Sequence, residues 1–328
     1  MGVLLEVENI SKVFTLSHSW VDRLARKPMR QLHALDQVSM ELQSGQIVGL
    51  VGESGSGKST LGRCIVRLYT PESGAIRFEG TDITDLSETE LLPLRRQMQM
   101  IFQNPYSSLN PRMNVRQMLA EVLTVHGIGS ADERNERILK LLELVGLPAD
   151  AADRLPGAFS GGQRQRIGIA RAIAVSPRLL IADEPVSALD VSIQAQIVNL
   201  LKQLQEEFNL AMLFISHDLR VVRHISSRVL VMYLGRIVED APTDVLFRDP
   251  QHPYTRILIE TAPKLEVKRQ TTTTLTVMGE IPSPLNLPSG CRFHTRCPFA
   301  VAMCAQVDPP LAEIAPGHKL ACHRPWLS

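Results

Sequence analysis

Near the start of this chain, a segment in which apolar and polar residues alternate is followed further on by an unbroken apolar run. Partial alternation over residues 3–14 predicts a half-buried strand, and the apolar run over 46–51 predicts a buried one. Helical spacing over 61–68 predicts a helix shortly after the second strand. We therefore expect a strand that passes through a glycine-rich turn into a helix.

The middle of the chain contains strands and helices in alternation. Short strands are predicted at 74–80 and 97–102, and helical spacing dominates residues 115–145. The apolar runs at 179–182 and 213–215 are typical of central strands in a parallel sheet. This order predicts an α/β core that is divided by a helical insert.

The turn between residues 51 and 61 has the composition of a phosphate-binding loop. Its residues are Gly52, Glu53, Ser54, Gly55, Ser56, Gly57, Lys58, Ser59 and Thr60. Glycines let backbone N–H groups face an anion, the helix N-terminus adds partial positive charge, and Lys58 adds a full charge. The Ser59 hydroxyl is a candidate Mg²⁺ ligand. A nucleoside triphosphate is the expected ligand.

Polar residues follow the predicted strands, at the sheet edge where α/β proteins bind ligands. Asp183 is expected to hold Mg²⁺, and Glu184 to orient and deprotonate the water that attacks the γ-phosphate. Gln103 is placed to complete the Mg²⁺ shell or to contact that water. His217 is either structural or able to reach the γ-phosphate.

A second anion site is predicted at the start of another helix. Ser160 is a natural N-cap, and Gly161 and Gly162 leave the unpaired N–H groups of the helix uncovered before Gln163. The alternative is a capped helix with no ligand. Asp190 could likewise be only a helix cap, and Phe14, at a strand end, either stacks on an adenine ring or packs in the core.

Taken together, these motifs resemble the ATPase subunits of ABC transporters over about residues 3–250. The resemblance implies that Phe14 stacks on adenine, that Gln103 lies in the loop that senses the permease, and that Asp190 contacts a second ATPase subunit. It also implies that the segment Ser160–Gln163 faces ATP held by the phosphate loop of that second subunit. Two chains would thus enclose two ATP molecules.

The C-terminal region narrows the resemblance. His252-Pro253-Tyr254-Thr255 and the later Cys-containing segment look like the extension of dipeptide and oligopeptide importer ATPases, closest to the F-type dipeptide subunit. Cys291, Cys297, Cys304 and Cys322 lie in this extension. Their spacing lacks the C-x2-4-C of most zinc sites, so a [4Fe–4S] cluster, zinc and unliganded thiols all stay open. Cys64, in an apolar helical run, is expected to be a small buried hydrophobe.

Composition bounds the remaining choices. A chain of 328 residues favours two domains, and a net charge of +1 gives no reason to expect a nucleic-acid partner. No apolar run approaches the length of a membrane span and no signal peptide is visible, so we expect the chain to stay in the cytoplasm. The resemblance to importer ATPases implies a peripheral position on the cytoplasmic face of the inner membrane. The basic segment 15–33 is interpreted as a solvated insertion, with contact to a membrane or partner as the alternative.

The sequence thus predicts a P-loop NTPase of the α/β class with an antiparallel β portion near the N-terminus. We expect an ABC ATPase domain at 1–250, with a helical subdomain at about 104–175, and an importer extension at 251–328. ATP and Mg²⁺ are the expected cofactors. The expected partners are a second, distinct ATPase, two membrane permeases and an extracytoplasmic solute-binding protein.

The expected function is ATP hydrolysis that powers import of dipeptides or oligopeptides. Nickel, glutathione-like compounds or oligosaccharides are alternative cargoes, because the permeases and the binding protein select the solute. A soluble ABC ATPase of DNA repair or translation is the alternative from another class. That class would favour a long coiled-coil insert, two cassettes in one chain or a strongly basic surface, and an export ATPase would usually lack the His-Pro-Tyr extension.

Overall fold

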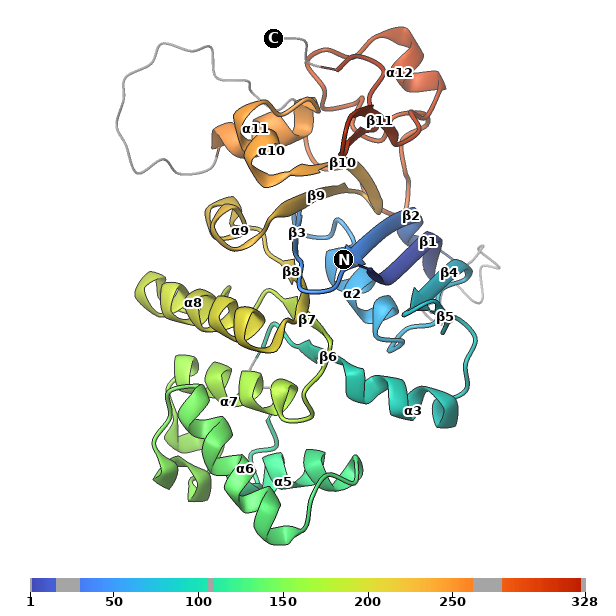
Figure 1. Cartoon of the computed structure of the whole chain (residues 1–328). Coiled ribbons are helices and arrows are strands. Elements are labelled where there is room, and N and C mark those ends of the chain that lie inside the picture. The colour runs from blue at the N-terminus through green and yellow to red at the C-terminus, as the bar shows by residue number, and fades with distance from the viewer. Residues whose placement is uncertain (1, 16–29, 105–108, 262–278, 326–328) are drawn as a thin grey trace, which may run out of the picture. The chain divides into compact units, whose positions relative to one another are not determined.

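The computed structural model describes residues 2–15, 30–104, 109–261 and 279–325. The chain divides into two compact units. Unit 1 consists mainly of Asp85–Ser216, and unit 2 of Leu5–Glu41, Val48–Thr84 and His217–Ser328. Figure 1 labels most of the helices and strands of both units.

Unit 1 contains three parallel strands in the order β6 (Met98–Ile101), β7 (Leu179–Asp183) and β8 (Ala211–Ile215). Every residue of β7 and β8 is buried. Continuous apolar runs are what a parallel sheet covered on both faces requires. The strands predicted from these runs are confirmed, and β7 extends one residue further to include Asp183.

Several helices of unit 1 begin at side-chain caps. They are α3 (Glu88–Gln97), α5 (Val115–Val125), α6 (Ala131–Leu144), α7 (Gly161–Ile173) and α8 (Val191–Phe208), with 3₁₀ turns η1 (Ala149–Asp153) and η2 (Pro156–Ala158). Asn114, Ser130 and Ser160 each start a helix with a capping box completed by a Gln or Glu three residues on. The predicted helical insert between β6 and β7 is therefore present.

Unit 2 contains an antiparallel sheet in the order β2 (Gln31–Gln43), β1 (Val3–Thr15), β4 (Ser73–Phe78) and β5 (Thr81–Asp82). In β1 and β4 the register pairs Leu5 with Phe78. This sheet is the antiparallel portion expected near the N-terminus. Strand β2 begins at Gln31, so the predicted insertion over 15–33 is too long at its C-terminal end; residues 16–29 lie outside the described ranges.

The other strands of unit 2 join the phosphate-loop strand to the C-terminal tail. Strand β3 (Ile47–Val51) runs parallel to β9 (Arg228–Tyr233), which pairs with β10 (Arg236–Pro242). Strand β12 (His318–Leu320) adds to β10, and β11 (Ala312–Ala315) adds to β12. The tail therefore extends the sheet that starts at the phosphate loop.

Five described helices belong to unit 2: α2 (Lys58–Ile65), α9 (Leu219–Ile225), α10 (Thr243–Arg248), α11 (Pro253–Thr261) and α12 (Ala302–Gln306). Helix α2 starts at Lys58, three residues before the predicted start at Leu61. The helix N-terminus thus lies inside the glycine-rich motif. Backbone N–H groups at this end have no partner within the helix and are available to an anion.

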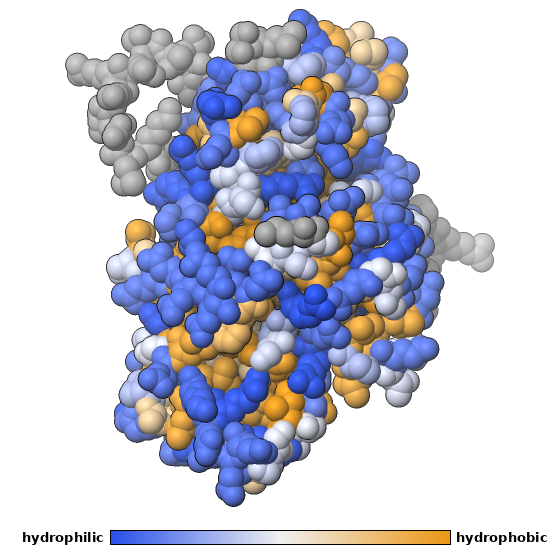
Figure 2. Space-filling model, viewed as in Figure 1, coloured by the Kyte–Doolittle hydropathy of each residue, from blue (hydrophilic) through white to orange (hydrophobic). Residues whose placement is uncertain are grey.

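The molecular face in Figure 2 is mainly hydrophilic, with hydrophobic residues scattered among the polar ones. Such a mixture is ordinary for a folded domain. Within the described part of the chain, no helix combines the length and the apolar character that crossing a bilayer demands.

Candidate nucleotide site

The phosphate loop of unit 2 connects β3 to α2. The side chain of Lys58, at the end of the loop, bonds back to the backbone of its first residues. The Lys58 ammonium donates to the carbonyl oxygens of Gly52 and Glu53, each at 2.9 Å. Gly57 has φ of +107°, and a Cβ there would collide with the Ala34 carbonyl. Glycine at this position is therefore a steric requirement of the loop.

The C-terminal extension also holds this loop, through contacts that no sequence motif indicates. The Tyr254 hydroxyl accepts a hydrogen bond from the Glu53 N–H at 2.8 Å, and Arg296 forms a two-point ion pair with the Glu53 carboxylate. Tyr254 belongs to the His-Pro-Tyr motif, and Arg296 directly precedes Cys297. The two motifs mark Tyr254 and Arg296 as residues of interest, but nothing in the sequence indicates that either contacts Glu53.

In unit 1, two of the predicted catalytic side chains meet. The Gln103 amide, just after β6, donates to the Glu184 carboxylate at 2.8 Å. Glu184 follows β7 and has φ of +45°, a conformation unusual for a residue with a side chain. Its N–H donates to the Ile215 carbonyl at 3.0 Å, which fixes the end of β7 against the end of β8. Asp183, the last residue of β7, is fully buried.

The segment Ser160–Gln163 starts α7, as expected. The Ser160 hydroxyl accepts from the Gln163 N–H at 3.3 Å, and the Gln163 side chain accepts from the Ser160 N–H at 3.0 Å. A Cβ on Gly162 would lie 2.6 Å from Ile193 of α8. The glycine thus allows α7 and α8 to approach closely, which is a packing reason that the sequence did not reveal.

Three further predicted site residues lie at or next to the ends of helices and strands. Asp190 occupies the N-cap position of α8, but its side chain makes no capping hydrogen bond. His217 is exposed between β8 and α9. The Phe14 ring packs edge-on against Tyr69, with ring centroids 5.3 Å apart.

The five cysteines differ in surroundings. Cys64 is fully buried in α2, where burial raises the pKa of its thiol to about 12, so the expectation of an inert apolar residue is confirmed. The other four line one small cavity in the tail, of about 20 Å³. Burial, with a smaller contribution from the neighbouring cysteines, raises the pKa of the Cys322 thiol to about 12, and a hydrogen bond to the backbone of Arg324 opposes the shift.

The described residues contain no group of three or more His, Cys, Asp or Glu side chains placed to hold a metal ion. A cavity of 20 Å³ has room for about one water molecule. The four tail cysteines, as arranged here, therefore do not fit a [4Fe–4S] cluster.

Comparison with known proteins decides the family. Residues 35–187 match the model of the ABC transporter family, and residues 238–304 match that of the oligopeptide/dipeptide transporter C-terminal region. The oligopeptide transport ATP-binding protein AppF of Bacillus subtilis is 50% identical over 325 residues, which cover 98% of this chain and 97% of AppF. This chain belongs to the ABC transporter ATPases.

Solved ABC cassettes have the same fold. The dimeric cassette MJ0796, with ADP and phosphate bound, is 29% identical and superposes with a TM-score of 0.64 over 73% of this chain and 99% of that one. The cassette cbiO1 of Clostridium perfringens is 26% identical, with a TM-score of 0.63 over 75% of this chain and 91% of its own. The P-loop NTPase fold expected from the sequence is confirmed, and this ABC ATPase uses ATP and Mg²⁺.

Proposed function

We propose that this ABC ATPase powers the import of dipeptides or oligopeptides through a membrane permease. The observation that carries the proposal is the similarity to AppF, an oligopeptide transport ATP-binding protein, over nearly the whole length of both chains. That similarity includes residues 238–304, the region matched to the oligopeptide/dipeptide transporter model. The extension, and not only the ATPase core, supports the peptide assignment.

Within this function, the residues of unit 2 bind ATP. Lys58 neutralises the phosphates from its position across the loop, and the N-terminus of α2 adds its N–H groups. The remaining loop residues Gly52–Thr60 surround the phosphates. Phe14 stacks on the adenine ring from β1, and His217 contacts the γ-phosphate.

Residues of unit 1 carry out hydrolysis. Glu184 accepts the proton of the attacking water, and Gln103 orients the same water or Glu184 through the hydrogen bond between them. The backbone of Glu184, held by the end of β8, keeps the carboxylate in one direction. Hydrolysis of this kind depends mainly on positioning and on charge stabilisation.

Magnesium fits the donors that the chain offers. Ser59, Gln103 and the fully buried Asp183 provide hydroxyl, amide and carboxylate oxygens, the ligand chemistry that Mg²⁺ prefers. When bound, the ion neutralises charge on the β- and γ-phosphates.

The second anion site acts on a second subunit. The segment Ser160–Gln163 presents a helix N-terminus that, in the proposal, faces ATP held by a paired ATPase, and Asp190 contacts the same subunit. The dimeric form of the solved relative MJ0796 supports this pairing. ATP then stabilises the closed pair, and its hydrolysis allows the pair to open.

A cluster at Cys291, Cys297, Cys304 and Cys322 stays a prediction that requires the tail to rearrange. Burial raises the pKa of the Cys291, Cys297 and Cys322 thiols, so a metal bound there would have to displace protons. Iron and acid-labile sulfide, measured on anaerobically purified protein, test it. Zinc at one per chain without sulfide would contradict the cluster.

The remaining subunits follow from the importer assignment. They are a second, distinct ATPase, two transmembrane permeases and an extracytoplasmic solute-binding protein. This chain would act at the cytoplasmic face of the membrane, with no nucleic-acid partner.

Purification of the tagged chain from detergent-solubilised membranes tests the function. We expect two hydrophobic subunits and a second ATPase to co-purify, and peptide-loaded binding protein to stimulate ATP hydrolysis in proteoliposomes. Recovery without hydrophobic subunits, with ATPase activity stimulated by DNA or ribosomes, would contradict the importer function.

A further inference from the structure

Glu53, the second residue of the phosphate loop, is held at three points. Its N–H donates to the Tyr254 hydroxyl at 2.8 Å, and its carbonyl accepts from the Lys58 ammonium at 2.9 Å. Its carboxylate accepts from Arg296 at 2.6 and 3.0 Å. Two of these three partners come from the C-terminal extension.

The pair between Arg296 and Glu53 has the geometry of a strong interaction. It is a parallel two-point contact of a guanidinium with a carboxylate, and the Arg296 side chain is only 7% exposed. Arg296 also donates to the Tyr233 hydroxyl at 3.3 Å. The Glu53 side chain is 25% exposed, so the pair is partly buried and less screened by solvent than an ordinary surface ion pair.

Tyr254 is fixed by aromatic packing. Its ring centroid lies 4.7 Å from that of Tyr233 and 5.4 Å from that of Phe293. Because the ring cannot shift without disturbing this cluster, the hydroxyl is a stable acceptor for the Glu53 N–H. That N–H is thereby turned toward the extension.

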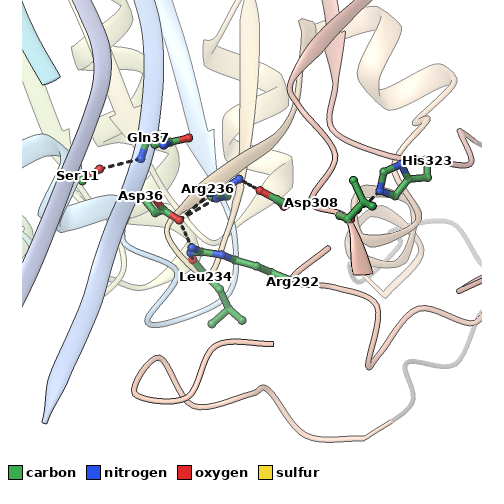
Figure 3. A network of polar contacts seen from close by, with 9 residues as sticks. Ser11, Asp36, Gln37, Leu234, Arg236, Arg292, Asp308 and His323 are labelled. Atoms are coloured by element: carbon green, nitrogen blue, oxygen red, sulfur yellow. Dashed lines mark hydrogen bonds and ion pairs between the residues drawn. The ribbon is translucent and has the colours of Figure 1, made fainter. Parts of the chain in front are cut away.

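A second arginine of the extension, Arg292, contacts the β9–β10 turn, which in turn bonds to the phosphate loop. Arg292 donates to the Leu234 carbonyl and to Asp36, which also pairs with Arg236 (Figure 3). Gly235, which follows Leu234, donates its N–H to the carbonyl of Ser56 in the phosphate loop at 2.8 Å. The extension therefore contacts both the phosphate loop and the β9–β10 turn on which the loop rests.

These contacts locate the phosphate-binding lysine. Lys58 is tied to the Gly52 and Glu53 carbonyls, so a displacement of Glu53 moves the acceptor that orients the ammonium group. A misplaced ammonium loses attraction for the phosphates, and binding weakens more than the chemical step does.

We propose that Arg296 and Tyr254 are positioning residues of the phosphate loop, which makes the C-terminal extension a part of the ATP site. The proposal rests on the proposed function in that the loop binds ATP. It goes beyond that function by giving the extension a role in nucleotide affinity.

Steady-state ATP hydrolysis by the assembled transporter tests the proposal. We expect R296Q to raise the KM for ATP about tenfold while kcat stays within about twofold, and Y254F to raise the KM about threefold. R296K should recover part of the loss, because an ammonium group still pairs with the Glu53 carboxylate. In the double variant R296Q/E53Q the KM should be no higher than in R296Q, since the two residues act through one contact.

Arg256→Gln is the matched control. Arg256 pairs with Glu260 at 2.9 Å within helix α11 of the same extension, so its loss removes an ion pair of the extension that does not involve residue 53. The KM of this variant should equal that of wild type. An unchanged KM in R296Q, or an equal rise in R256Q, would overturn the proposal.

Hydrogen–deuterium exchange of the full chain without nucleotide gives an independent reading. Amides of the loop 52–60 should exchange faster in R296K and Y254F than in R256Q, whereas those of the segment 291–304 should not change. Faster exchange throughout the tail, with no change in the loop, would also overturn the proposal. Because this readout requires no turnover, it stays decisive if wild-type protein fails to hydrolyse ATP, a result that would count against the proposed function alone.

Discussion

At the scale of single residues, the geometry around Glu184 combines an unusual backbone with a fixed side chain. A positive φ costs a residue with a side chain about 1 kcal/mol or more, and it persists where surrounding contacts impose it. Here the contacts are the Glu184 N–H to the Ile215 carbonyl and the carboxylate to Gln103. Such strain is common where a protein must aim one reactive group.

Glu184→Gln should separate ATP binding from hydrolysis. The amide keeps the shape and the neighbouring contacts but cannot accept the water's proton, so we expect at least a 100-fold loss of turnover with ATP affinity retained. ATPase assays and binding of a fluorescent ATP analogue measure the two effects. Glu207→Gln, on the exposed part of α8, is the control. Wild-type turnover in E184Q would show that Glu184 is not the base.

His252 should make the protein less stable in mild acid. The residue is buried, its Nδ1 accepts from the Tyr254 N–H at 3.1 Å, and burial lowers its pKa from 6.5 to about 4, with nearby Glu239 opposing the shift. Below pH 6.5 His252 binds a proton in the unfolded chain, whereas in the folded chain it stays neutral down to about pH 4. Stability is therefore fully present above pH 6.5 and falls as the pH drops through this window.

Thermal unfolding at pH 7.5 and pH 5 measures this effect. We expect wild type to lose about 2 kcal/mol more than His252→Asn between these pH values. Asparagine is chosen because its side chain can still accept from the N-terminal N–H groups of α11. Equal losses in both proteins would contradict the assignment of this acid sensitivity to His252.

At the scale of elements, helix α7 shows how one sequence feature serves local and tertiary structure together. Its capping box satisfies the N–H groups of Ser160 and Gln163, and Gly162 allows the close approach of Ile193 from α8. The sequence pattern revealed the cap, because a cap depends on residues three apart. It could not reveal the partner across the helix interface.

Two alanine substitutions in α7 should have opposite effects on stability. Gly162→Ala places a methyl group 2.6 Å from Ile193 and should lower stability by about 1–3 kcal/mol. Gly168→Ala meets no atom within 4 Å and should raise stability by about 0.5–1 kcal/mol, because alanine favours the helix. Thermal unfolding distinguishes the two variants. If G162A had wild-type stability, α8 would be able to move away from the added methyl group without a loss of stability.

At the scale of the whole molecule, the predicted nucleotide residues are distributed over two units. The phosphate loop lies in unit 2, and Glu184, Gln103 and the segment Ser160–Gln163 lie in unit 1. Under the proposed pairing, Ser160 serves ATP on another subunit. Loss of Ser160 should therefore affect assembly and not the chain's own affinity for ATP.

Ser160→Arg in the E184Q background should abolish ATP-dependent association of ATPase subunits, while the isolated chain still binds ATP. Sedimentation velocity with and without ATP measures association. Ser130→Arg removes the same kind of capping box from α6 and controls for the lost cap. The pairing model fails if a demonstrably monomeric Ser160→Arg protein, with Glu184 intact, hydrolyses ATP at the wild-type rate.

The sequence by itself determined the features that depend on neighbours along the chain. The loop Gly52–Thr60, the cap at Ser160 and the apolar strands β7 and β8 follow from short-range spacing and continuous hydrophobicity. The start of α2 was predicted three residues late, and no strand was predicted over β2. A helix start inside a glycine-rich loop and a strand after a basic segment both contradict local propensity.

Tertiary structure alone decided which distant residues meet. The contacts of Glu53 with Tyr254 and Arg296, 201 and 243 residues away, arise because β9, β10 and β12 carry the tail back to the phosphate loop. The pairing of Gln103 with Glu184, 81 residues apart, likewise needs the parallel alignment of β6 and β7. Strand pairing sets these distances, and no local pattern encodes which strands will pair.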